Sequence, residues 1–123
     1  MKRLLLSAFL SFALAPTASS FALMEHTFED NLKISEVAVI GSAASERHQI
    51  AEDPSGHFYV TISVRQVLKG RVRPQIELLV TPDDVEFDPR CCVLDGMYIL
   101  LLKKIDSNRY ATVNGHFGAY EIR

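Results

Sequence analysis

The chain has 123 residues, of which 48% are hydrophobic, 9% aromatic and 23% charged, with Gly 6, Pro 5 and Cys 2. This balance is typical of a folded protein and excludes collagen, low-complexity chains and disulfide-dense miniproteins. The length leaves room for one domain around one core. It is too short for a two-domain enzyme, a doubly wound dinucleotide-binding fold or an α/β barrel.

The N-terminal segment has the pattern of a secretory signal peptide. A positively charged start, Met1–Arg3, precedes the apolar run Leu4–Ala15, which is shorter than the ~20 residues that a membrane-spanning helix needs. Small residues favour cleavage after Ala22, with cleavage after Ser20 as the alternative. We therefore expect a signal peptide over 1–22 and one domain over 23–123, exported to the periplasm or secreted, with no membrane span after cleavage.

The charge balance argues against nucleic acid as a partner. The formal net charge is −2, and removal of the basic start makes the remaining chain more acidic. An acidic chain is poorly suited to collecting phosphates. The local basic stretch of Arg65, Lys69, Arg71 and Arg73 is expected to be a solvated turn between two strands.

The first half of the domain predicts two strands. Leu23–Leu32 has no clean period and is expected to be an irregular arm, whereas Lys33 begins a β-branched segment that predicts the first strand. A polar loop over Ser45–His57 ends in a Pro-Ser-Gly turn. Phe58–Leu68 alternates apolar and polar residues and predicts the clearest strand. Its alternation slips near Arg65-Gln66, which predicts a β-bulge.

The second half predicts three or four more strands. Gln75–Thr81 alternates again and is expected to form a hairpin with the preceding strand, whereas the acidic, proline-flanked Pro82–Arg90 is expected to be a loop. Met97–Leu102 is apolar on both faces, as in a doubly covered central strand. Arg109–Val113 and His116–Arg123 are expected to be a fifth strand and a last short extension.

Five or six short strands and no convincing helical period indicate an all-β fold. The prediction is a five- to six-stranded antiparallel OB-like barrel, with a small β-sandwich as the alternative. Periodicity alone does not separate the two architectures. The bulge favours a curved sheet and therefore the barrel.

The order and spacing of several segments resemble the netrin-like domain shared with tissue inhibitors of metalloproteases. The resemblance covers roughly Ile34 to Ile122. The segments that carry it are Val37–Gly41, Val60–Ile62, Val67–Gly70, Cys92–Leu101, Tyr110 and Gly115–Tyr120.

The resemblance implies an OB-type barrel in a secreted protein, and domains of this kind mostly bind other proteins. In the inhibitors of that family, a mature N-terminal cysteine binds the protease zinc and is joined by a disulfide to the loop before the fourth strand. That loop aligns with the region of Cys91 and Cys92. Cleavage after Ala22 exposes Leu23, and no cysteine precedes Cys91, so neither the chelating residue nor its disulfide is carried over.

Cys91 and Cys92 are the two cysteines of a chain that is expected to reach an oxidising compartment. Adjacent cysteines can close only an eight-membered ring, which makes the bond more reducible than a relaxed disulfide. Three states stay open: a structural pair of thiols, a vicinal disulfide, or an intermolecular or reactive site. A thiol/disulfide or metal-responsive role for this pair is an alternative function.

The sequence predicts no catalytic, metal or cofactor site. The four histidines fit no recognised ligand spacing. No G-x-S-x-G elbow, H-E-x-x-H helix or phosphate-binding glycine loop is present. We therefore expect a non-enzymatic protein without a bound cofactor or metal ion. The histidines are His26, His48, His57 and His116.

The predicted function is protein binding through loops at one end of the barrel. The expected surface is the Pro82–Cys92 connection, joined by the arm Leu23–Asn31. Phe87 stands in the acidic loop and is expected to be an exposed anchor. An oligosaccharide-binding OB domain is the other alternative, and it requires exposed tyrosines at 59, 98 and 110. The partner-binding residues predicted within this connection are Asp84, Glu86, Phe87 and Arg90.

Overall fold

The computed structural model describes residues 27–82, 84, 87–89 and 91–123. The predicted signal peptide, Glu86 and Arg90 lie outside the described residues. The elements in chain order are α1 (Phe28–Ile34), β1 (Val37–Ala43), β2 (Phe58–Lys69), β3 (Gln75–Val80), β4 (Met97–Lys104), β5 (Arg109–Thr112), the 3-10 helix η3 (Gly115–Gly118) and β6 (Ala119–Glu121).

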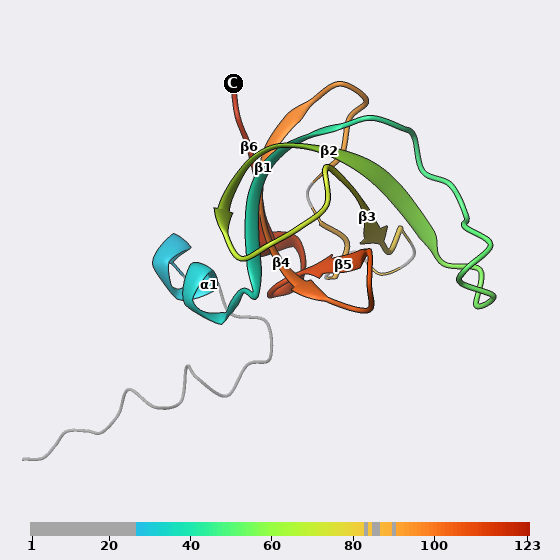
Figure 1. Ribbon diagram of the computed structural model, residues 1–123, viewed down its shortest axis with the longest axis horizontal. Coiled ribbons are helices and arrows are strands. Elements are labelled where there is room, and N and C mark those ends of the chain that lie inside the picture. The colour runs from blue at the N-terminus through green and yellow to red at the C-terminus, as the bar shows by residue number, and fades with distance from the viewer. Residues whose placement is uncertain (1–26, 83, 85–86, 90) are drawn as a thin grey trace, which may run out of the picture.

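The strands form a closed barrel of the OB-like type, as the sequence predicts (Figure 1). The strand order is β1-β2-β3-β5-β4, and pairing between β1 and β4 closes the barrel, while β6 adds a strand beside β4. A single closed sheet excludes the sandwich alternative. Four barrel contacts are antiparallel, but β3 and β5 run parallel with Leu78 opposite Tyr110, so the barrel is mixed.

The long strand β2 bends across the barrel (Figure 1). The bulge expected near Arg65-Gln66 is present in its pairing with β1. Ile40 of β1 faces Gln66, and the next residue, Gly41, faces Val64. Arg65 is therefore the extra residue of β2 at this point. The bulge allows the N-terminal half of β2 to pair with β3 and the C-terminal half to pair with β1.

The barrel interior is filled by side chains from alternate positions of the strands. Members of this core with no measurable exposure are Val39, Val60, Ile62, Ile76, Leu78, Leu100 and Leu102. A second cluster of Ala38, Leu101 and Val113 lies outside the barrel, where Phe28, Leu32 and Tyr120 pack against it. β4 is thus covered on both faces, as its apolar sequence predicts.

Over the part of Leu23–Leu32 that the structure describes, the prediction of an irregular arm was wrong, and so was the prediction of a strand from Lys33. Phe28–Ile34 is helical, and the first strand begins at Val37. The side chain of Thr27 accepts a hydrogen bond from the backbone N–H of Asp30 at 3.1 Å, which caps the helix. Seven residues are too few for a helix that is stable alone, so packing on the barrel decides this element.

Asn31 shows how α1 is held. This side chain is fully buried, and its Nδ2 donates to the carbonyl oxygen of Phe117 at 3.3 Å and to the phenol oxygen of Tyr120 at 3.2 Å. The ring of Phe28 also packs edge-on against Tyr120. Within the described residues, no helix is long and apolar enough to cross a membrane.

Candidate functional site

The connection between β3 and β4, residues 81–96, carries large apolar side chains that face solvent. Phe87 is 49% exposed, Val93 69% and Leu94 46%. Asp84 is exposed in the same connection. The described part of the segment has no helix or strand, in agreement with the loop that the prolines and acidic residues predict.

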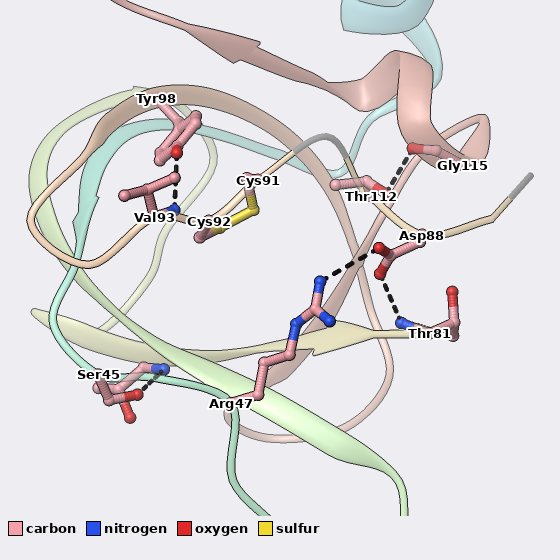
Figure 2. The surroundings of a disulfide bond; sticks show 11 residues. Ser45, Arg47, Thr81, Asp88, Cys91, Cys92, Val93, Tyr98, Thr112 and Gly115 are labelled. Atoms are coloured by element: carbon pink, nitrogen blue, oxygen red, sulfur yellow. Dashed lines mark hydrogen bonds and ion pairs between the residues drawn. A yellow bond between two sulfur atoms is a disulfide. The ribbon is translucent and has the colours of Figure 1, made fainter. Parts of the chain in front are cut away.

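Cys91 and Cys92 are joined by a disulfide (Figure 2). Of the three states that the sequence left open, the structure has the vicinal disulfide. Both cysteines are partly buried and pack against the barrel core. They also line a hollow of about 560 Å³. Its other lining residues are Glu46, Arg47, Val93, Tyr98 and Glu121.

The segment after the disulfide is fixed to the barrel by hydrogen bonds. The backbone N–H of Val93 donates to the phenol oxygen of Tyr98 at 2.8 Å (Figure 2). The backbone N–H of Asp95 donates to the carbonyl oxygen of Ala43 at 2.8 Å, and the N–H of Ala43 donates to the carbonyl oxygen of Gly96 at 3.0 Å. The exposed side chains of Val93 and Leu94 therefore project from a backbone that is held in place.

The segment before the disulfide is held by Asp88. One oxygen of its carboxylate accepts from the backbone N–H of Thr81 at 2.8 Å, and the other pairs with the guanidinium of Arg47 at 3.3 Å. Arg47 comes from the loop between β1 and β2 and points toward Asp88 (Figure 2). Two connections far apart in the sequence are thus joined beside the hollow.

The described part of the predicted N-terminal arm has a structural role. The hydrogen bonds of α1 join it to η3, to β6 and to Lys69, whose ammonium group donates to the carbonyl oxygen of Leu32 at 2.8 Å. Residues 23–26 lie outside the described residues.

A second group of polar side chains, which the sequence analysis missed, surrounds Asp53. This carboxylate is only 9% exposed and accepts hydrogen bonds from the backbone N–H of Ser55 at 3.0 Å and the phenol of Tyr59 at 2.6 Å. Arg109 of β5 pairs with it at 3.2 Å. The hydrogen bonds from Ser55 and then Tyr59 hold the pKa of Asp53 well below its usual range. An Asp followed two residues later by a turn serine was the sequence signal for this contact.

Arg109 connects this group to the turn after β4. Its guanidinium binds the carboxylate of Asp106 and also donates to Tyr59 at 3.0 Å. The hydrogen bond to Asp106 raises the pKa of Arg109 above its ordinary value, and burial raises the pKa of Tyr59. The group ties the loop between β1 and β2 to the barrel, because its members come from the loop, from β2 and from β5.

The hydroxyl of Ser45 and the imidazole of His48, both in this loop, lie close to the carboxylate of Glu77 in β3. The Nε2 atom of His48 is 3.0 Å from the carboxylate of Glu77, and its Nδ1 atom is 3.2 Å from the hydroxyl of Ser45. That hydroxyl accepts from the backbone N–H of Thr61 at 2.9 Å and donates to the carbonyl oxygen of Glu46 at 2.9 Å. Because backbone groups already engage the serine, the arrangement fastens the loop to β2 and β3.

The structure also bears on a metal site and on a sugar-binding surface. Within residues 27–82, 84, 87–89 and 91–123, no group of three or more His, Cys, Asp or Glu side chains could hold a metal ion. Tyr59, Tyr98 and Tyr110 are buried, so they offer no exposed platform for stacking sugars. The condition on which the oligosaccharide hypothesis depends is therefore not met by these three residues.

Comparisons with protein-family models, with curated proteins and with solved structures find no match. The resemblance to netrin-like domains stays a prediction that depends on the order of its motifs.

Proposed function

We propose that the protein is an exported binding module that holds another protein at the end of the barrel formed by residues 81–96. The observation that carries this proposal is the exposure of Phe87, Val93 and Leu94 on a connection that hydrogen bonds join to the barrel at Asp88 and over residues 93–96. Val93 and Leu94 are neighbours in the chain and are both exposed, and exposed apolar patches are typical of interaction surfaces. The backbone of residues 93–96 is held by hydrogen bonds before a partner binds, so it loses little conformational entropy on binding, which favours affinity.

The surroundings of these apolar side chains suggest the chemistry of the partner. Glu46, Asp84 and Asp95 are exposed on this end of the barrel, whereas the cation Arg47 is paired with Asp88. A partner surface that presents apolar side chains with lysine or arginine around them would complement this end. Charge complementarity of this kind raises the association rate and suppresses wrong partners.

The test is a pull-down from the exported protein fraction, followed by identification of the retained protein. The double variant Val93→Ser, Leu94→Ser should lose the partner, because it removes apolar contact area and leaves the backbone hydrogen bonds in place. Ile105→Ser, at an exposed position in the turn after β4, is the matched control and should retain the partner. Equal retention by both variants would contradict the proposal.

A thiol/disulfide role for Cys91 and Cys92 is the second candidate function. It is favoured by the position of the disulfide on the wall of the hollow, where both cysteines are partly exposed. In this reaction an external dithiol would reduce the bond, so that the protein gains two thiols and the reductant becomes a disulfide. Titration of free thiols after treatment with graded thiol/disulfide buffers tests it. A pair that stays oxidised in buffers that reduce ordinary exposed disulfides would contradict it.

A further inference from the structure

The end of the barrel opposite the 81–96 connection has a different surface. β4 begins next to that connection, where Gly96 bonds to Ala43, and ends at Lys104. The far end therefore comprises the end of α1, the turn between β2 and β3, and the end of β4. It carries six cationic side chains, which we call the basic end: Lys33, Lys69, Arg71, Arg73, Lys103 and Lys104.

Glu36 holds these three segments together. Its backbone N–H donates to the carbonyl oxygen of Leu102 at 2.8 Å, and its carboxylate accepts from the backbone N–H of Lys104 at 2.6 Å. Gly70 lies directly against its carbonyl oxygen, since a Cβ atom at Gly70 would be 2.6 Å from that oxygen. Lys69 adds the bond to Leu32 that fastens α1 to β2. The basic residues are thus gathered on a fixed surface.

The six cations outnumber the described carboxylates that lie near them without an ion-pair partner, which are those of Glu36 and Glu52. Among the described residues, none of the six cations forms an ion pair with a carboxylate. Glu36 keeps its negative charge while its carboxylate accepts from the backbone N–H of Lys104. Arg73 lines a hollow with Glu52, Glu77 and Asp106, of which Asp106 is paired with Arg109 and Glu77 with His48. All six except Lys69 are exposed. A net positive field therefore stands at one end of a chain that is acidic as a whole.

Large aliphatic side chains are exposed among these cations. Each of them is within two residues of a member of the basic end, and together they are Ile34, Val67, Leu68 and Ile105. Lysine and arginine alone would suit any polyanion. The exposed aliphatic side chains add nothing to the binding of nucleic acid phosphates, but they can enter the apolar boundary of a bilayer.

We propose that the basic end binds the surface of a bilayer that contains anionic phospholipids. The cations lie among the headgroups, and the four aliphatic side chains reach toward the acyl chains. Each lysine or arginine near such a surface strengthens binding roughly five-fold. Bound in this way, the protein directs the 81–96 connection away from the membrane.

The experiment is sedimentation with lipid vesicles, using the full chain as it is recovered after export. The probes are vesicles of phosphatidylcholine alone and of phosphatidylcholine mixed with phosphatidylglycerol. The readout is the ratio of the two affinities, which depends on the charged surface. The test variant is Lys103→Gln, Lys104→Gln, and the matched control is Arg123→Gln, which changes an exposed cation near the other end. A second pair, Arg71→Gln, Arg73→Gln, is used if the first does not fold.

We expect the protein to bind the vesicles that contain phosphatidylglycerol at least ten-fold more tightly than those of phosphatidylcholine alone, and this preference should decrease as salt is added. The preference should drop about ten-fold or more in the double variant but not in Arg123→Gln. Equal binding to both vesicles, or an equal effect of Arg123→Gln, overturns the proposal. The variant Ile34→Ser, Leu68→Ser should also weaken binding. If this variant binds the vesicles as tightly as the unchanged protein, and duplex DNA competes fully with the vesicles, the site recognises phosphate polymers and not a bilayer. That result would also overturn the proposal.

Discussion

The backbone N–H of Val93 donates a hydrogen bond to the buried phenol oxygen of Tyr98, at 2.8 Å. This contact joins the segment that follows the disulfide to strand β4, which begins at Met97. It fixes the most exposed apolar side chain of the proposed binding surface relative to the barrel.

Tyr98→Phe should therefore loosen the binding surface while keeping the barrel. The substitution removes the acceptor of the Val93 N–H, and the expected cost is about 1–2 kcal/mol in the free energy of unfolding. Urea unfolding measures it, and faster amide exchange at Val93 reports the local loosening. Tyr110→Phe is the matched control, because no hydrogen bond of the described residues involves its buried phenol. An equal loss of stability in both variants would contradict the role of the hydrogen bond.

Phe87→Ala should lower the affinity for the partner by about ten-fold or more, since aromatic anchors contribute strongly to interfaces. The stability should change by no more than about 0.5 kcal/mol, because the side chain is exposed. Binding titration and thermal melting of the same samples provide the two measurements. A matching loss of melting temperature would show that Phe87 supports the core.

Acid should destabilise the protein through Asp53. The pKa of this carboxyl is lowered in the folded state by hydrogen bonds from Ser55 and Tyr59. A lowered folded-state pKa stabilises the folded protein fully at pH values above the unfolded-state pKa of about 4. This stabilisation is lost progressively as the pH falls from the unfolded-state pKa toward the lower folded-state pKa. Urea midpoints at about pH 7 and about pH 3 should therefore differ, with the lower value in acid.

Asp53→Asn should reduce that difference, because the amide does not titrate. Asp84→Asn is the control, since Asp84 is exposed and its side chain has no partner among the described residues. If Asp53→Asn keeps the full pH dependence, the acid sensitivity comes from other carboxylates.

Gly70 should tolerate no side chain. Its φ is +80°, and a Cβ atom would meet the carbonyl oxygen of Glu36. Gly70→Asn should destabilise the protein by about 1–3 kcal/mol. Gly56→Asn is the matched control, with a φ of +83° but with only the flexible side chain of Gln49 near the added atom. Because asparagine accepts positive φ, the control should lose much less stability in urea unfolding. Equal losses of stability in the two variants would show that the positive φ causes the destabilisation, and not the contact with Glu36.

The strands could be predicted because their side chains alternate. Ile76, Leu78 and Val80 point into the barrel as the alternation indicates, and the slip after Val64 marks the bulge at Arg65. The helix α1 could not be predicted from periodicity, since it has only two turns and is stabilised by contacts of Phe28 and Asn31 with residues far along the chain. Its cap at Thr27 was the local signal that could have indicated it.

Only part of the candidate site could be predicted from the sequence. Phe87 in an acidic, proline-flanked loop indicated an exposed aromatic side chain, and the adjacent cysteines indicated three possible states. The polar group of Asp53, Tyr59 and Arg109 could not be foreseen, because Arg109 is 50 residues from Tyr59 in the chain.

The sequence by itself determined where the chain is extended, because alternation of apolar and polar side chains is a local property that survives in any arrangement of the strands. Only the tertiary structure decided that β3 and β5 run parallel, that Glu36 gathers the basic end, and that the disulfide borders a hollow. These relationships depend on hydrogen bonds and packing between segments distant in sequence. Closure of the barrel brings those segments together, and no local pattern encodes it.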